Sequence, residues 1–228
     1  NDDRLEFVKA HNEWRNSAAG GNLPWTVEHP NPDDSPVYAL GLHRFRYDME
    51  LERNAVDFAR QCIWAHSRGL GHTRNPHSYG ENMFLTGAST PDRGMLRSSV
   101  TAWGNEFRRY SHKTRQTTGV VGHYTAMIWG STVRVGCGVA ACHDFAQSGT
   151  TDGVVIVCQY FTAGNYVGAT PFEFSTDVAE LGSNCPVPFN MDPEYPNLCA
   201  DQGDICATGI NDRETNRCNL ANSASVCV

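Results

Sequence analysis

Histidine and glutamate side chains in four short segments are the candidates for chemistry in this chain. They are His66 in AHS, Glu81 in YGEN, Glu106 in WGNE and His123 in GHYTAMIW. Neutral imidazoles are good ligands for Zn²⁺, and carboxylates can orient such imidazoles by accepting a hydrogen bond from the second ring nitrogen. The nine histidines are dispersed, so any metal site must be assembled from distant segments, which spacing alone does not show.

Other motifs for catalysis are missing from the sequence. There is no GxSxG elbow, HExxH pair, P-loop or GxGxxG turn, so a familiar hydrolase, zincin or nucleotide-binding enzyme is not supported. His72, His77 and His112 belong to no motif, and we expect them at the surface.

Periodicity predicts the elements that position these segments. Apolar residues at helical spacing indicate three helices, over residues 7–18, 51–62 and 91–107, with Asp48 as N-cap of the second and Pro91-Asp92 opening the third. Residues 133–139 and 154–161 are rich in β-branched and aromatic residues and indicate strands. Residues 20–37 hold four prolines and read as a loop. This order, without regular βαβ alternation, favours an α+β layered fold.

Charge and hydropathy exclude two kinds of partner. The net charge is −7, which argues against nucleic acid because phosphate binding needs clustered positive charge. The longest apolar run, Val154 to Cys158, is far shorter than the roughly 20 residues that cross a bilayer. We therefore expect no transmembrane segment, and any membrane contact would be peripheral.

Nine cysteines indicate disulfides and an oxidising compartment. The chain also opens at Asn1 without a hydrophobic leader, as a processed secreted protein would, so we predict secretion. Five of the nine crowd into the last 44 residues, a polar segment that needs disulfides to fold. An odd number leaves one thiol over, which is compatible with a monomer or a disulfide-linked homodimer.

Several separated motifs together resemble the CAP superfamily (SCP/TAPS: cysteine-rich secretory proteins, antigen 5 and pathogenesis-related proteins). The segments are the four named above, in that order, followed by VGCG at 135–138 and VIVCQYFTAGNY at 155–166, the last departing from the family pattern at Thr162. The C-terminal cysteines are similar to those of parasitic-worm venom-allergen-like and activation-associated secreted proteins. The resemblance implies a CAP domain over 1–166 and a linker with a cysteine-rich extension over 167–228.

The resemblance also implies a fold, a site and a disulfide pattern. The fold is a three-layer α-β-α sandwich around an antiparallel sheet. The family's cleft tetrad falls on His66, Glu81, Glu106 and His123, with the histidines as ligands of a divalent metal, Zn²⁺ or else Mg²⁺ or Cu²⁺, and the glutamates supporting them. Family patterning pairs Cys62 with Cys142, and Cys137 with Cys158.

Two functional classes follow from the resemblance. One is a secreted protein that binds sterols or fatty acids, with Phe107 and Tyr110 on a mobile sterol loop and fatty acid held between helices. Such a protein would act in extracellular interactions, including contact with a protein receptor or modulation of host immunity. The other is a metal-dependent hydrolase or protease that uses the His/Glu tetrad, although no activated Ser or Cys nucleophile is visible.

Overall fold

A four-stranded sheet forms the middle layer of the protein. The computed structural model describes residues 2–23, 36–67, 79–143, 152–185 and 191–200. The strand order is β2-β4-β5-β3, with β2 at Arg46–Tyr47, β4 at Arg134–His143, β5 at Asp152–Phe161 and β3 at Gly80–Thr86. The strands β3, β4 and β5 pair antiparallel as expected. The short edge strand β2 runs parallel to β4, and the chain between Tyr47 and Arg134 forms the crossover that parallel strands need.

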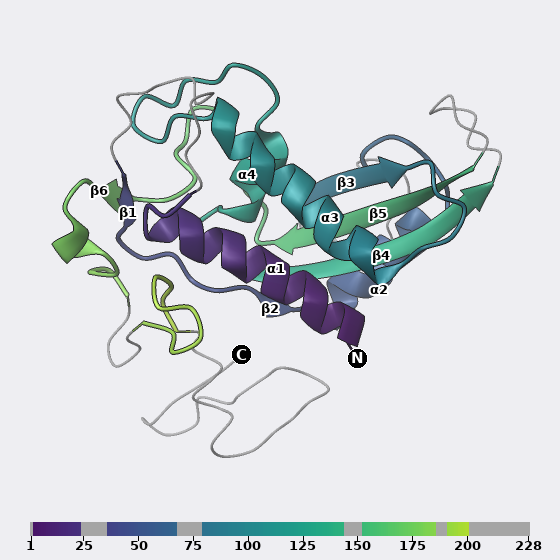
Figure 1. The fold of residues 1–228 in the computed structure, drawn as a ribbon, viewed down its shortest axis with the longest axis horizontal. Helices are drawn as coiled ribbons and strands as arrows, with labels where there is room; N and C mark the ends of the chain where they lie inside the picture. Colours follow the sequence, from purple (N-terminus) through teal and green to yellow (C-terminus); the bar gives the residue numbers. More distant parts are fainter. Residues whose placement is uncertain (1, 24–35, 68–78, 144–151, 186–190, 201–228) are drawn as a thin grey trace, which may run out of the picture.

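Helices cover both faces of this sheet, which confirms the predicted α-β-α sandwich (Figure 1). On one face lie α1 (Asp2–Ala19), α3 (Arg93–Gly104), the 3₁₀ turn η1 (Asn105–Arg109) and α4 (Gly122–Met127), and on the other lies α2 (Met49–Ala59). The predicted N-cap Asp48 is confirmed, and Asp92 caps the helix that Pro91-Asp92 was predicted to open. Asp48 accepts from the backbone N–H groups of Glu50 and Leu51, and Asp92 accepts from that of Met95.

The residues of β5 alternate between the two cores. Val154, Ile156 and Tyr160 pack with α1, α3 and α4, whereas Val155 and Val157 pack with Phe58 and the rest of the α2 face. A strand with both faces covered is expected to read as a continuous apolar run, and this is the pattern in the sequence.

Two glycines let α2 approach the sheet closely. A Cβ placed on Gly136 would lie 2.3 Å from the backbone nitrogen of Glu52, and one on Gly138 would lie 2.3 Å from that of Val56. The absence of a side chain at these two positions of β4 therefore sets the spacing between the helix and the strand.

The strand β3 and the helix α4 were not predicted from the sequence. Both carry motif residues, Glu81 in β3 and His123 in α4. The strand begins with Gly-Glu-Asn, which has low strand propensity, and α4 has only six residues, too few to show a helical period. Most of the predicted loop at 20–37 lies outside the described residues.

Part of the segment after Tyr166 packs against the domain. The strand β6 (Phe174–Ser175) pairs antiparallel with β1 (Tyr38–Ala39), and a short 3₁₀ turn, η3 (Val178–Glu180), follows. Phe172, Tyr195 and Leu198 are buried in one apolar cluster with the end of α1. The domain boundary at Tyr166 remains a prediction, but this segment is in contact with the domain.

The disulfides implied by the resemblance are confirmed. Cys62 is bonded to Cys142 and Cys137 to Cys158, and a third bond joins Cys185 to Cys199. The remaining cysteines, Cys206, Cys218 and Cys227, lie outside the described residues. Within the part of the chain that the structure describes, no helix is long and apolar enough to cross a membrane.

Candidate functional site

His66 and Glu81 form the first His–Glu pair. The Nδ1 atom of His66 lies 3.0 Å from Oε1 of Glu81, at the start of β3. The same carboxylate accepts hydrogen bonds from the backbone N–H of Ser67, at 2.9 Å, from the Ser67 hydroxyl and from Nε2 of Gln159, at 3.1 Å. Burial raises the pKa of Glu81, but these hydrogen bonds outweigh it, so the pKa lies below its ordinary value and the group stays ionised at neutral pH.

Glu106 and His123 form the second pair. The Nδ1 atom of His123 lies 2.7 Å from Oε1 of Glu106. The other carboxylate oxygen accepts from the backbone N–H groups of His123, at 3.0 Å, and Tyr124, at 3.2 Å. The glutamate on η1 therefore holds both the ring and the first turn of α4, and Trp103 stacks against the imidazole with 6.2 Å between ring centroids.

Asn82 links the two pairs through the protein interior. It follows Glu81 on β3, and its Nδ2 donates to the backbone oxygen of His123 and to the Tyr160 hydroxyl, both at 3.0 Å. The Tyr160 oxygen lies 3.0 Å from Nε2 of His11, whose Nδ1 lies 2.8 Å from the Phe7 oxygen. The fully buried His11 was not predicted to take part, since its place in an apolar helical stripe gives no signal for a polar network.

Burial sets the protonation of this network. It lowers the pKa of His11 to about 4, so the ring is neutral at physiological pH. A neutral ring that donates from Nδ1 to the Phe7 oxygen accepts at Nε2, so Tyr160 donates to it. The chain of hydrogen bonds from His11 to the His123 backbone is therefore fully satisfied.

The two pairs line two separate hollows. His66 and Glu81 line one of about 240 Å³ with Tyr79, Tyr160 and Asn165, and Glu106 and His123 line an open trough of about 540 Å³ with Trp64, Met83 and Trp103. Among the described residues, no three His, Cys, Asp or Glu side chains are gathered as a metal site. The structure thus brings the four predicted residues together as two linked pairs and not around one point.

The arrangement favours ligand binding over nucleophilic catalysis. In each pair the carboxylate faces Nδ1, and in a neutral ring that donates from Nδ1 the lone pair is left on Nε2, the atom that binds a metal. The Ser67 hydroxyl donates to Glu81 and not to an imidazole. Within the described residues, no serine or cysteine is hydrogen-bonded to His66 or His123 as a nucleophile to its base would be.

The two residues expected on a sterol loop lie in the core. Phe107 is buried between Trp14 and Tyr124, and Tyr110 is buried against His112. The surface position expected for His112 is wrong. Its Nε2 lies 2.9 Å from the Tyr124 hydroxyl, and burying the ring satisfies that otherwise isolated group. His72 and His77 lie outside the described residues.

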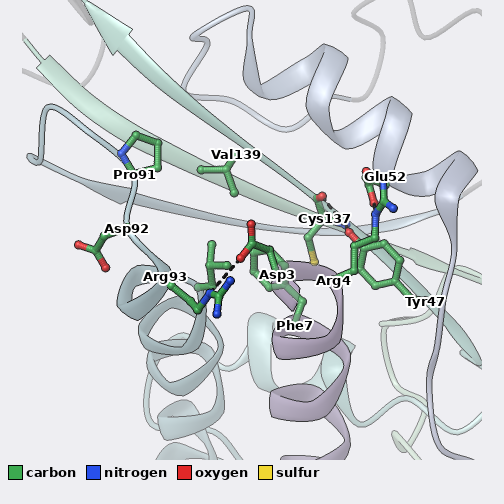
Figure 2. A pocket seen from close by; sticks show the side chains of 11 residues that line it. Asp3, Arg4, Phe7, Tyr47, Glu52, Pro91, Asp92, Arg93, Cys137 and Val139 are labelled. Atoms are coloured by element: carbon green, nitrogen blue, oxygen red, sulfur yellow. Dashed lines mark hydrogen bonds and ion pairs between the residues drawn. The ribbon is translucent and has the colours of Figure 1, made fainter. Parts of the chain in front are cut away.

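A pocket of about 270 Å³ opens between α1, α3 and the sheet (Figure 2). We call it the α1–α3 pocket. Its apolar lining is Phe7, Leu96, Cys137, Val139 and Pro91, with Tyr47 at one side. Its charged rim contains Arg4, whose guanidinium is paired with Glu52, and Arg93, whose Nε lies 3.1 Å from Asp3.

Comparison with known proteins decides the family. The model of the cysteine-rich secretory protein family, CAP, matches residues 8–160, which is more than half of the chain. The chain belongs to the CAP family. This CAP chain is 31% identical over 184 residues to cysteine-rich secretory protein 3 of Equus caballus, covering 79% of this chain and 65% of the relative. It is 29% identical over 196 residues to Ancylostoma secreted protein of Ancylostoma caninum, covering 81% of this chain and 42% of the relative.

Solved CAP structures share the fold. The structure titled Na-ASP-1 superposes with a TM-score of 0.68 at 26% identity, covering 87% of this chain and 47% of that one. The structure titled NaASP2 with Zn²⁺ superposes with a TM-score of 0.66 at 29% sequence identity, covering 86% of this chain and 94% of that one. Of the two sequence relatives, cysteine-rich secretory protein 3 and Ancylostoma secreted protein, the CAP chain spans about two thirds of the length or less.

Proposed function

We propose that this CAP chain is a secreted binding protein that holds a divalent metal ion through His66 and His123. The observation that carries the proposal is the Nδ1–carboxylate contact in each pair, 3.0 Å to Glu81 and 2.7 Å to Glu106. Such contacts leave Nε2 as the metal-binding atom and increase its basicity. The family name and the secreted relatives support an extracellular location.

The donor set indicates the kind of ion. Imidazole suits Zn²⁺ and Cu²⁺ better than Mg²⁺, which prefers oxygen ligands. The neighbour titled NaASP2 with Zn²⁺ supports Zn²⁺ as the ion. Two imidazoles leave the remaining positions to water or to a bound group, and a metal in such an open site acts as a Lewis acid. Binding one ion through both histidines requires the two His–Glu pairs, which line separate hollows, to approach each other.

Calorimetric titration with Zn²⁺ tests the proposal. Wild type should bind one ion, and His66→Ala and His123→Ala should each remove that same site. His143→Ala is the matched control, because exposed His143 also faces a carboxylate, with Nδ1 2.9 Å from Asp152. Two independent weak sites, each lost with one histidine, would contradict a shared ion, as would loss of binding in His143→Ala.

The α1–α3 pocket supports a second candidate function, binding of a fatty acid. Its apolar lining suits an acyl chain (Figure 2). Arg4 and Arg93 at the rim are already paired with Glu52 and Asp3, so a carboxylate headgroup would have to displace one of these acids or stay in solvent. The volume, about 270 Å³, lies near the lower end of the range for small-molecule sites, roughly 300–1,000 Å³. Sterol binding at Phe107 and Tyr110 stays a prediction, since it requires both rings to leave the core, and the receptor and immune roles stay predictions too.

Displacement of a fluorescent fatty acid by palmitate tests this second function. Val139→Phe narrows the α1–α3 pocket and should weaken binding at least tenfold. Val178→Phe, at an exposed position on η3, is the control and should bind as wild type does. Equal binding by wild type and Val139→Phe would show that the acyl chain lies elsewhere.

A further inference from the structure

Positive charge is concentrated in one segment of this acidic protein. Residues 107–143 contain five Arg or Lys and no Asp or Glu, although the net charge of the chain is −7. Four of the five lie between Arg108 and Arg115. Arg93 and Arg97 on α3 are paired with acids of α1, but in the described part of the chain Arg108, Arg109 and Arg115 make no ion pair. We call residues 108–119 the basic loop.

Hydrogen bonds hold the basic loop in one conformation. The Thr118 N–H donates to the Arg109 oxygen and the Ser111 N–H to the Gln116 oxygen, both at 3.0 Å, and Tyr110 and Thr117 form a β-bridge. Tyr110, a residue of the basic loop, is itself buried and attaches the loop to the core. The charged side chains are therefore presented from a fixed scaffold.

An apolar turn lies beside the basic loop. The Ala169 N–H donates to the Tyr166 oxygen at 3.1 Å, and Gly168 has a φ of +83°, as the third position of a type II turn requires. Val167 at the tip is fully exposed, at 104% of its reference area, and Tyr166 is 60% exposed. The Tyr166 ring packs edge-on against Trp129, with 5.8 Å between ring centroids, whereas the Val167 side chain is wholly open to solvent.

Two hydrogen bonds join the turn to the basic loop. The Arg115 guanidinium donates to the Gly168 oxygen at 2.7 Å, and Nδ2 of Asn165 donates to the Gly122 oxygen at 2.6 Å. Val120, 62% exposed, follows the basic loop directly. Figure 1 shows both segments at the end of the molecule where α4 lies, so charge and apolar surface share that end.

We infer that this end of the protein is a docking surface for an anionic phospholipid membrane. Basic side chains are attracted to the negative surface of such a bilayer, and the apolar turn enters the boundary between headgroups and acyl chains. Tyrosine is enriched at that boundary. A sulfated glycan would pair with the arginines and would leave the exposed side chains of Val167 and Val120 in water, so the combination favours lipid.

Sedimentation with vesicles tests the inference. Wild type should bind vesicles made of phosphatidylcholine with roughly one third phosphatidylserine, and it should bind far less to vesicles of phosphatidylcholine alone. Binding to the anionic vesicles should weaken as the salt concentration rises. Arg109→Glu should lower the partition coefficient roughly fivefold or more, while Arg109→Lys keeps it. Val167→Asp should lower the partition coefficient as well. It should do so at high salt too, because salt screens the attraction of charges and not the insertion of an apolar side chain.

Matched controls separate the surface from general charge and hydropathy. Arg53→Glu changes an exposed arginine on α2, across the sheet, and Val178→Asp changes an exposed valine on η3. Both should sediment as wild type does. Equal binding to neutral and anionic vesicles, or no binding to either, would overturn the inference. Heparin binding that needs Arg109 but not Val167, with vesicle binding unchanged in Val167→Asp, would assign the surface to a glycan instead.

Discussion

The side chain of Asn82 is hydrogen-bonded to the backbone of His123, with 3.0 Å between Nδ2 and the carbonyl oxygen. Asn82 directly follows Glu81, so one strand supports the His66 pair with one residue and the His123 pair with the next. The two pairs are thereby coupled through β3 although they line different hollows.

Asn82→Ala is expected to weaken Zn²⁺ binding about 10- to 100-fold while leaving the stoichiometry unchanged. The reason is that His123 loses a buried hydrogen bond that fixes the first turn of α4. Calorimetry measures the affinity, and Asn54→Ala, at a buried asparagine on α2, is the control. An unchanged affinity in Asn82→Ala would show that the strand does not position the ring.

The buried His11 predicts a stability change in mildly acidic solution. Its pKa is about 4 in the folded protein and 6.5 in the unfolded chain, because burial disfavours the charged ring. The unfolded state thus binds the proton first as pH falls. Stability from the neutral ring is complete above about pH 6.5 and is lost progressively down to about pH 4, by about 3 kcal/mol.

Urea unfolding at several pH values measures this loss. The variant His11→Gln does not titrate, so the difference in unfolding free energy between wild type and variant should shrink across that interval. A difference that stays constant from pH 7 to about pH 4 would contradict the assignment of the effect to His11.

Arg15 is expected to be irreplaceable by lysine. It is fully buried, and the hydrogen bonds it donates go to the carbonyl oxygens of His43, Met127, Trp129 and Thr132. They join α1 to the segment before β2 and to the end of α4 with the residues that follow it. Burial lowers its pKa to about 9, so the guanidinium still carries its charge at neutral pH. A lysine cannot reach all four acceptors from its single nitrogen.

Arg15→Lys should therefore lower the free energy of unfolding by about 3–5 kcal/mol, the range for breaking a buried charged network. Arg97→Lys is the control. Its ion pairs with Glu6 and Glu13 are exposed, and the change should cost less than about 1 kcal/mol. Comparable losses in the two variants would contradict the role given to Arg15.

Gly138→Ala should destabilise the fold by forcing α2 away from β4. The added Cβ would lie 2.3 Å from the Val56 nitrogen and 2.4 Å from the Ala55 carbonyl carbon, and a helix backbone cannot yield as a flexible side chain does. We expect a loss of about 1–3 kcal/mol in urea unfolding. Gly87→Ala, with no atom within 4 Å of the added Cβ, should be nearly neutral, and similar effects at both positions would contradict the close-approach argument.

Local signals were enough to predict much of the fold. The helical period of α1, α2 and α3, the cap Asp48 and the apolar run of β5 are properties of short segments, and each appears in the structure. The resemblance to CAP proteins added the two disulfides of the domain and the four polar residues of the cleft.

Only the tertiary structure decided which groups meet. The pairing of Glu81 with His66 and of Glu106 with His123, the burial of Phe107 and Tyr110, and the network from His11 to Asn82 all join residues distant in the sequence. Periodicity records which face of an element is apolar, but it does not record which element covers that face. Contacts of this kind depend on how the layers pack, so the amino-acid sequence determined the elements and the residue types, and the packing determined their chemistry.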